Sequence, residues 1–381
     1  MSKTCSPLGW AFETVGTLAT FEYGAALQAE RRSGDGYPVF GSNGQVGKHS
    51  SSLMQGPGIV VGRKGTVGAV VWSETPFWPI DTTYYVLPRP GIDLRWLYWV
   101  LLSLELGRFD SSTGVPGLNR KDAYDQMVCR PPLPEQRRIA EILDTLDDQI
   151  QFTEAALTKA LTVEEALFES LARTANTAPI RLGTLLSASP KNGYSPVSAG
   201  EVTGSYLVGL GCLTKHGFEA RQLKNAPAND PLLQPALLHD GDLLLSRSNT
   251  RELVGMAGVF RDVGVRCYYP DLMMRLPTKP QVNVAFLEMA LRSNAVRTQI
   301  QNLAGGTSGS MVKVSGAGVS GLTVELPEPP EQESIMRVVL AARSQRLDIA
   351  SSLSKFRALR TGLMADLLSG HVRVPGGESD G

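Results

Sequence analysis

Residues 41–48 contain the glycines and the lysine from which phosphate-binding loops are built. Such a loop has two glycines five residues apart, then a lysine and a Ser or Thr that holds magnesium. Here the first glycine is one residue out of place, and His49 follows Lys48. Residues 209–211, Gly-Leu-Gly, lack the third glycine of a dinucleotide-binding fingerprint. We therefore interpret the first stretch as a glycine-rich turn and the second as a strand or turn.

Motifs for catalysis are absent from the rest of the sequence. A DNA amino-methyltransferase carries an Asn/Asp-Pro-Pro-aromatic motif, but the double prolines here, at residues 131–132 and 329–330, have other neighbours. A common magnesium nuclease motif has an acid two residues before a lysine, and none of the lysines has one. The four histidines, His49, His216, His239 and His371, show no metal-ligand spacing. The sequence predicts a chain that is not an enzyme and binds neither a metal nor a cofactor.

The formal net charge is zero, from 37 basic and 37 acidic residues, which excludes a bulk polycationic mode of DNA binding. The distribution is uneven, because residues 133–178 carry nine acidic and four basic residues while residues 1–132 and 179–328 are mildly basic. This pattern permits DNA contact through local arginines.

Neither the membrane nor an oxidising compartment is indicated. The longest apolar run, residues 96–102, is far shorter than the roughly 20 residues that cross a bilayer. The N-terminus lacks the apolar core of a secretory signal. The cysteines, Cys5, Cys129, Cys212 and Cys267, form no Cys-x-x-Cys pair. We expect a cytoplasmic protein without structural zinc.

An internal repeat organises the chain. Pro-Glu-Gln at residues 134–136 recurs at residues 330–332, an offset of 196, and each copy opens a long helical pattern. Gly-Thr-Leu at residues 16–18 recurs at residues 183–185, and two apolar strands end at Arg63 and Arg247. We predict globular domains at residues 1–132 and 179–328, each followed by a helical segment, at residues 133–178 and 329–381.

The two helical segments carry the same heptad register. With Ile139 as an a position, eight of the ten a and d sites up to Leu171 are apolar, and so are eight of ten from Ile335 to Leu367. We predict that the helices pack on each other as a coiled coil, although each could instead cover only its own domain. Glu164, Arg346 and Arg360 interrupt the seams and should find partners.

Short apolar runs bounded by Gly, Pro and Asn predict strands at residues 58–62, 68–72 and 83–87. Residues 93–107 and 284–303 have helical patterns. The predicted fold class is therefore α+β, with two pseudo-symmetric α/β domains separated by two long helices.

These features resemble the specificity subunit of Type I restriction-modification systems. The most specific runs are Thr113 to Asp122, with Gly-Val-Pro-Gly-Leu-Asn-Arg-Lys, and Pro131 to Asp144, with Pro-Pro-Leu-Pro-Glu-Gln-Arg-Arg-Ile. Residues 7–10, 63–68 and 362–370 support the resemblance. The second half is looser, because residues 305–311 stand where the first half has Gly-Val-Pro-Gly-Leu.

The resemblance implies two target-recognition domains that read the two halves of a bipartite double-stranded DNA sequence. It implies that the helices separate the domains and dock two modification (adenine N6 methyltransferase) subunits, and that restriction/translocase subunits join the complex. S-adenosylmethionine, ATP and magnesium would then belong to those partners. The alternatives are a protein-interaction adaptor and a free-standing DNA-modifying enzyme with unrecognised motifs.

If both halves bind one duplex, polar loops near glycines must supply the contacts, since Arg pairs with guanine and Asn or Gln with adenine. Structural roles compete, because Asn and Ser cap turns and many arginines only face solvent. The candidate DNA-binding residues are Ser42, Asn43, Gln45, Lys48, Arg63, Lys64, Asn119, Arg120, Lys121, Arg247, Ser248, Asn249, Thr250 and Arg251.

The helical segments lead to two further expectations. Residues 135–171 would extend roughly 55 Å as a helix, more than one DNA turn of about 34 Å, and so suit a spacer between half-targets. The exposed acidic faces of the first helix suit a partner-docking surface or an ordinary solvated face; their acids are Asp144, Asp147, Asp148, Glu165 and Glu169.

Overall fold

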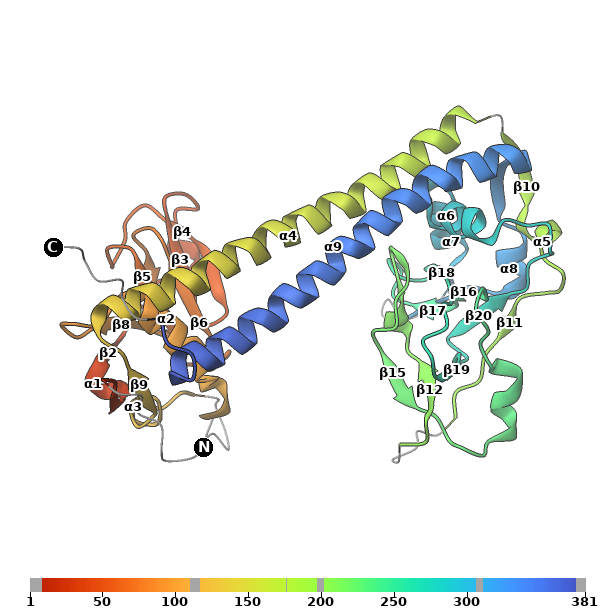
Figure 1. Ribbon diagram of the computed structural model, residues 1–381. Coiled ribbons are helices and arrows are strands. Elements are labelled where there is room, and N and C mark those ends of the chain that lie inside the picture. Colours follow the sequence, from red (N-terminus) through yellow and green to blue (C-terminus); the bar gives the residue numbers. More distant parts are fainter. Residues whose placement is uncertain (1–8, 110–116, 176, 197–201, 306–310, 375–381) are drawn as a thin grey trace. The chain divides into compact units, whose positions relative to one another are not determined.

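The computed structural model describes residues 9–109, 117–175, 177–196, 202–305 and 311–374 (Figure 1). Cys5 and residues 7–8, 113–116 and 306–310 of the runs discussed above lie outside these ranges. The chain forms two compact units: unit 1 combines Met1–Ala155 with Ala350–Gly381, and unit 2 is Ala156–Ile349. The long helices α4 (Leu133–Thr174) and α9 (Pro329–Ser369) each contribute a segment to both units. The predicted domain boundaries stay predictions.

Unit 1 is built on a four-stranded antiparallel sheet in the order β2-β8-β5-β6. Two predicted strands are found as β5 and β8, whereas the strand expected at residues 68–72 starts at Val70 because Gly68, with φ 74°, belongs to the preceding turn. Helix α2 starts at an Asp93 cap and buries Trp96 and Trp99 in the core. The elements are β1 (Ala11–Thr14), α1 (Val15–Leu18), β2 (Ala19–Tyr23), β3 (Tyr37–Gly41), β4 (Gly44–His49), β5 (Gly58–Gly62), β6 (Val70–Ser73), β7 (Trp78–Pro79), β8 (Thr83–Pro88), α2 (Leu94–Ser103), α3 (Arg120–Tyr124) and β9 (Met127–Arg130).

Unit 2 has a corresponding four-stranded sheet in the order β11-β20-β16-β18. The helical pattern predicted at residues 284–303 is confirmed as two helices, α6 and α7, because Ser293 between them adopts an extended conformation (φ −60°, ψ 151°) and caps the second one. The elements are β10 (Thr177–Arg181), α5 (Leu182–Leu185), β11 (Lys191–Asn192), β12 (Ser205–Val208), β13 (Leu213–Thr214), β14 (Gly217–Phe218), β15 (Leu223–Asn225), β16 (Leu243–Ser246), β17 (Ser248–Asn249), β18 (Ala257–Val259), β19 (Arg266–Tyr268), β20 (Met273–Leu276), α6 (Val284–Arg292), α7 (Asn294–Leu303), β21 (Val312–Lys313), α8 (Gly316–Ser320) and β22 (Thr323–Pro327).

The duplication inferred from sequence is visible in the strand topology. In each unit the central strand of a three-stranded sheet is antiparallel to one neighbour and parallel to the other, β3 with β4 and β7, and β12 with β15 and β19. A two-stranded pair also recurs, as β1–β9 in unit 1 and β10–β22 in unit 2. The two units therefore share one plan, and positions can be matched through their backbone hydrogen bonds.

Helices α4 and α9 pack on each other, as the heptads predict. All twenty a and d positions are buried or half-buried, whereas exposed residues lie between them. The helices are antiparallel, since in unit 1 Asp147 pairs with Arg360 and Glu154 with Arg357. The residues that interrupt the seams have partners, because Glu164 accepts hydrogen bonds of 2.7 Å from both Arg343 and Arg346 in unit 2.

The repeated Pro-Glu-Gln motif begins both long helices for a local reason. The side-chain amide of Gln136 donates to the carbonyl of Pro131 at 2.9 Å, and that of Gln332 donates to Pro327 at 2.8 Å. Both glutamines are buried. Each thus ties the proline-containing approach to the first turn, where a helix leaves backbone groups without intrahelical partners.

Candidate nucleic-acid interface

Two arginines and two tyrosines meet on unit 1 and form what we call the Tyr23 cluster: Tyr23, Arg63, Tyr84 and Arg120. Tyr23 and Tyr84 are paired residues of the neighbouring strands β2 and β8. The Arg120 guanidinium lies 4.3 Å from the centre of the Tyr23 ring, and that of Arg63 lies 5.1 Å from it. Tyr23 is 55% exposed although its neighbours are packed against it. The cluster is therefore a preformed cationic and aromatic surface.

The guanidinium groups of the cluster are held in place by their neighbours. Arg63 donates through Nη2 to the carbonyl of Asp81 at 2.7 Å, and its buried Nε has no partner among the described residues. Burial favours the neutral form of Arg120, but the nearby Tyr23, Tyr124 and Tyr84 outweigh this and raise its pKa. Burial, with Tyr23 as neighbour, raises the pKa of Tyr84, so this phenol stays protonated. Both arginines present hydrogen-bond donors from a restricted geometry, which suits base edges or phosphates.

The other candidates of unit 1 lie near this cluster to different degrees. Lys64 is exposed, and its backbone forms a bridge with Gly117, two residues before Asn119. Asn119 caps α3 by accepting from the Lys121 backbone, while Lys121 itself is exposed. The fold thus brings together two segments that are more than fifty residues apart in sequence.

The remaining four candidates of unit 1 lie on the β3–β4 hairpin. The Ser42 hydroxyl donates to the carbonyl of Thr82 at 2.6 Å, and Ser42 is only 8% exposed, so it serves the interior. Asn43, Gln45 and Lys48 are exposed. The stretch that resembled a phosphate loop is this hairpin, with Gly44 at φ 101° in its turn.

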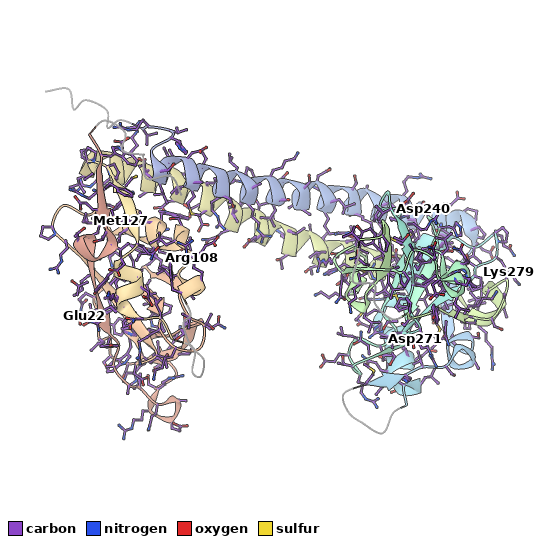
Figure 2. The ribbon with its side chains drawn as sticks, turned by 90° about the horizontal axis from the view of Figure 1, so that it is seen from below. Glu22, Arg108, Met127, Asp240, Asp271 and Lys279 are labelled. Carbon is purple, nitrogen blue, oxygen red and sulfur yellow. The ribbon has the colours of Figure 1, made fainter. Side chains whose placement is uncertain are left out.

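The loop after β16 in unit 2 repeats the hydrogen bonds of the loop after β5. The backbone amides of Arg63 and Lys64 donate to Thr82, and those of Arg247 and Ser248 donate to Leu272 in the same way. The Arg247 guanidinium contacts the carbonyl of Asp271, labelled in Figure 2, as Arg63 contacts Asp81. Arg63 and Arg247 are therefore equivalent in backbone and in side chain.

The other candidates of unit 2 have mixed environments. Ser248 is buried and pairs in the β17–β21 ladder with Lys313, an exposed residue that sequence reasoning missed. The Asn249 side chain accepts from the Thr250 backbone. Thr250 and Arg251 are exposed, and Arg251 donates to the carbonyl of Gln301 at 3.0 Å. Arg247, Asn249 and Lys313 therefore carry most of the available polar chemistry here.

The two equivalent surfaces differ in side-chain chemistry. Asn192, which pairs with Met274, takes the position that Tyr23 holds opposite Tyr84. Ser315 caps α8 as Asn119 caps α3, so Gly316 stands where unit 1 has Arg120. Unit 1 presents two arginines on aromatic rings, and unit 2 presents one arginine with amide and lysine side chains.

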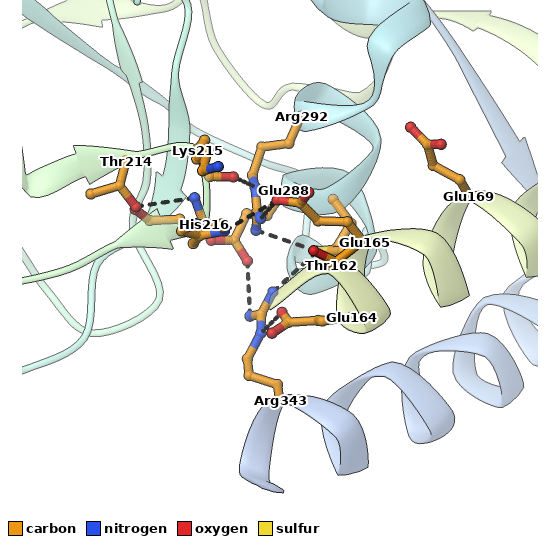
Figure 3. Close-up of polar contacts among 12 residues, drawn as sticks. Thr162, Glu164, Glu165, Glu169, Thr214, Lys215, His216, Glu288, Arg292 and Arg343 are labelled. Atoms are coloured by element: carbon orange, nitrogen blue, oxygen red, sulfur yellow. Dashed lines mark hydrogen bonds and ion pairs between the residues drawn. The ribbon is translucent and has the colours of Figure 1, made fainter. Parts of the chain in front are cut away.

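Ion pairs join the rest of each unit to the long helices, and they are buried in unit 2 and half-buried in unit 1. In unit 2, Arg343 bridges Glu164 of α4 and Glu288 of α6, and Glu288 also accepts from the Val259 backbone (Figure 3). His216 contacts Glu165 at 3.1 Å, and burial lowers the pKa of His216. In unit 1, Asp144 of α4 accepts from Arg95 and Trp99 of α2 at 2.7 and 2.8 Å. These contacts therefore fasten α6 and β18 of unit 2, and α2 of unit 1, to the long helices.

These contacts correct the expected acidic face of α4. Asp144, Asp147, Glu165 and Glu169 are half-buried and bind Arg95, Arg360, His216 and Asn294, whereas Asp148 is exposed. The exposed helix surface has an apolar feature instead. Val163 and Leu359, 196 residues apart and therefore equivalent in the repeat, are 42% and 50% exposed.

No group of three or more His, Cys, Asp or Glu side chains that could hold a metal ion occurs among the described residues. Within the same ranges, no helix has the length and apolar character needed to cross a membrane.

The chain is similar to proteins of one kind. Residues 7–162 match the Type I restriction modification DNA specificity domain. The Type I restriction enzyme EcoprrI specificity subunit of Escherichia coli is 29% identical over 156 residues, 41% of this chain and 37% of that protein. The EcoKI specificity subunit of Escherichia coli K12 is 24% identical over 265 residues, 64% of this chain and 57% of that protein. The chain thus spans roughly a third to just over half of these relatives.

Solved structures share the fold. The S subunit of a Type I restriction-modification system from M. genitalium matches with a TM-score of 0.59 at 15% identity, over 97% of each chain. A chain from a study of complex assembly in the type I R-M system matches with a TM-score of 0.52 at 13% identity, over 97% of this chain and all of that one. By the domain match over residues 7–162 and by the sequence relatives, the chain is similar to the specificity subunits of Type I restriction-modification systems, and it shares the fold of their solved structures.

Proposed function

We propose that this chain is the non-catalytic subunit that selects the DNA target of a Type I restriction-modification complex. The observation that carries the proposal is the pair of equivalent loops, at Arg63 and at Arg247, which share backbone geometry and differ in surrounding side chains. A duplicated scaffold with divergent polar loops suits the reading of two different half-targets.

Each loop would read one half of a bipartite duplex target. Arg63 and Arg120 can donate paired hydrogen bonds to guanine, and Asn192 or Asn249 can pair with adenine. The exposed lysines, Lys64 and Lys121 in unit 1 and Lys313 in unit 2, suit phosphates, which position a protein on DNA without specifying sequence. The α4 helix, 42 residues long, would act as part of the spacer between the half-targets.

Modification subunits would supply the adenine N6 methylation with S-adenosylmethionine, and restriction subunits the ATP- and magnesium-dependent steps. We assign their docking to the outer surface of the long helices. Val163 and Leu359 support this, because exposed apolar side chains recur at the same register in both halves. One exposed apolar side chain that recurs at the same register in each half suits two copies of one modification subunit.

The test is adenine-methylation mapping of DNA from a host that expresses this chain with and without its candidate modification subunit. A bipartite methylated motif that requires both proteins supports the proposal. Exchange of the two globular domains should reverse the order of the half-targets. Absence of any motif despite a soluble complex would favour the adaptor, and methylation by this chain alone would favour an enzyme.

Two variants test which unit of the chain reads which half-target. Arg120→Ala should relax one position of one half-target, by about 10- to 100-fold in discrimination, because a paired arginine contact is worth roughly 1–3 kcal/mol. Arg247→Ala should affect only the other half. Arg89→Ala, an exposed arginine outside the Tyr23 cluster, is the control and should leave the motif unchanged. If Arg120→Ala and Arg89→Ala give the same motif, the Tyr23 cluster does not read bases.

A further inference from the structure

The ion pairs of the helix seam are divided by charge. In the four ion pairs that join α4 to α9 in the structure, the carboxylate lies on α4 and the guanidinium on α9. They are Asp147–Arg360 and Glu154–Arg357 in unit 1, and Glu164–Arg343 and Glu164–Arg346 in unit 2. In these ion pairs α4 therefore supplies the negative charges and α9 the positive ones.

The internal repeat makes this division unexpected. Arg343 lies 196 residues after Asp147, and Arg360 lies 196 residues after Glu164. Equivalent positions of the repeat therefore carry opposite charges, and the pairs Asp147–Arg360 and Arg343–Glu164 are one contact, repeated with its charges exchanged.

The apolar part of the seam does not distinguish the two helices. Ile139 corresponds to Ile335, Leu143 to Val339, and Leu171 to Leu367. Seven of the eight apolar a and d positions of α4 have an apolar counterpart in α9, and the exception is Ile150, which corresponds to Arg346. Such a seam would allow α4 to pack on the α4 of a second copy with the same geometry. Apolar burial alone would not prevent this, because it is not directional.

The charges do prevent it. In a symmetric pair of two α4 helices, position 147 of one copy would face position 164 of the other, and both are carboxylates. In a symmetric pair of two α9 helices, positions 343 and 360 would be two guanidiniums. The Glu164 side chain is 3% exposed where it meets Arg343, so an unmatched charge at this site would be desolvated.

We propose that these seam charges are a pairing code, which directs α4 to α9 and excludes association of like helices between copies of this chain. The consequence rests on the proposed function, because a self-paired half would carry two identical reading surfaces and select a symmetric target. The code makes one chain present its two different surfaces together.

The test uses the full-length chain and the two ion pairs of unit 1, both of which join α4 to α9. One variant makes this part of α4 basic (D147R/E154R), a second makes this part of α9 acidic (R357E/R360D), and a third combines all four changes. The control, D148R/K355E, alters exposed charges of the same helices. Unfolding temperature is measured without DNA, as is co-purification of two differently tagged, co-expressed copies.

We expect the first two variants to unfold about 5–10 °C below the wild type, and the combined variant and the control to match it. Two wild-type copies should not co-purify, whereas the D147R/E154R and R357E/R360D chains should co-purify one to one, because each offers the helix that the other lacks. The proposal is overturned if the single-helix variants are stable and do not associate, or if the combined variant is no better than they are. Since no step involves DNA, failure of target reading would appear only in the methylation maps.

Discussion

Removal of the Glu164 carboxylate tests how strongly burial determines the contribution of an ion pair to the free energy of unfolding. Glu164 is 3% exposed by its side chain and accepts from Arg343 and Arg346 at 2.7 Å each. Glu164→Ala leaves Arg343 with Glu288, but it leaves the buried Arg346 guanidinium without its carboxylate. Loss of one partner of a buried pair costs about 3–5 kcal/mol.

The matched control is Glu154→Ala on the same helix. Glu154 and Arg357 are 45% and 57% exposed by their side chains, and such surface pairs contribute about 0–1 kcal/mol. At about 2–4 °C per kcal/mol for a unit of this size, Glu164→Ala should lower the unfolding temperature by about 10 °C and Glu154→Ala by at most a few degrees.

The assay is urea and thermal unfolding of the full-length chain, followed by circular dichroism. A second variant, Glu164→Leu with Arg346→Leu, removes both charges and should recover most of the loss, since apolar replacement of a buried pair is often neutral. Equal losses for Glu164→Ala and Glu154→Ala would refute the reasoning, and so would a double variant no more stable than Glu164→Ala.

Three further predictions concern the pKa of Glu164, a phosphate contact of Lys64 and the backbone at Gly68. Burial would raise the pKa of Glu164, but the hydrogen bonds and charges of Arg343 and Arg346 outweigh it and hold the pKa below 4.5. The stabilisation by this carboxylate should therefore be present above pH 4.5 and vanish as pH falls through the lower pKa of the folded state. Urea unfolding between pH 7 and 3 would measure this dependence, and Glu164→Gln should abolish it. Lys64→Ala should weaken binding to all DNA sequences alike and reduce the slope of affinity against salt by about one, whereas a change in target sequence would contradict a phosphate contact. Gly68→Ala should destabilise unit 1, because φ is 74° and a Cβ would lie 2.2 Å from the Gly107 nitrogen. Gly65→Ala, which is also left-handed (φ 83°) but faces open space, should lower the unfolding temperature less. Equal losses for the two variants would show that the contact with Gly107 is unimportant.

The long helices and a few apolar strands, among them β5 and β8, could be predicted because their signals are local. Each heptad position samples the same seam every three or four residues, and an uninterrupted run such as β5 can only be buried on both faces. The two differences were also local: Gly68 delays the start of β6 and Ser293 divides one helical pattern into two helices, and periodicity does not report single dihedral angles.

The candidate site was predicted only in part. Arginines and lysines in polar loops could be chosen from composition, but Tyr23 and Tyr84 belong to strands whose pairing brings them beside Arg63 and Arg120. Lys313 was missed for the same reason, since only the β17–β21 ladder places it beside Ser248. Ser42 was chosen for its residue type, and the structure commits its hydroxyl to Thr82.

The sequence by itself determined the duplication, the helix register and the absence of known catalytic motifs, because each is a pattern in the order of residues. Only the tertiary structure decided which polar side chains are bound to partners within the fold and which are exposed to solvent and to ligands. Asp144 and Glu164 have the same charge as Asp148, yet the first two are occupied by Arg95 and Arg343 while Asp148 is exposed. The difference is physical: a charge becomes available or committed through the partners that folding brings within hydrogen-bonding distance, and those partners lie far away along the chain.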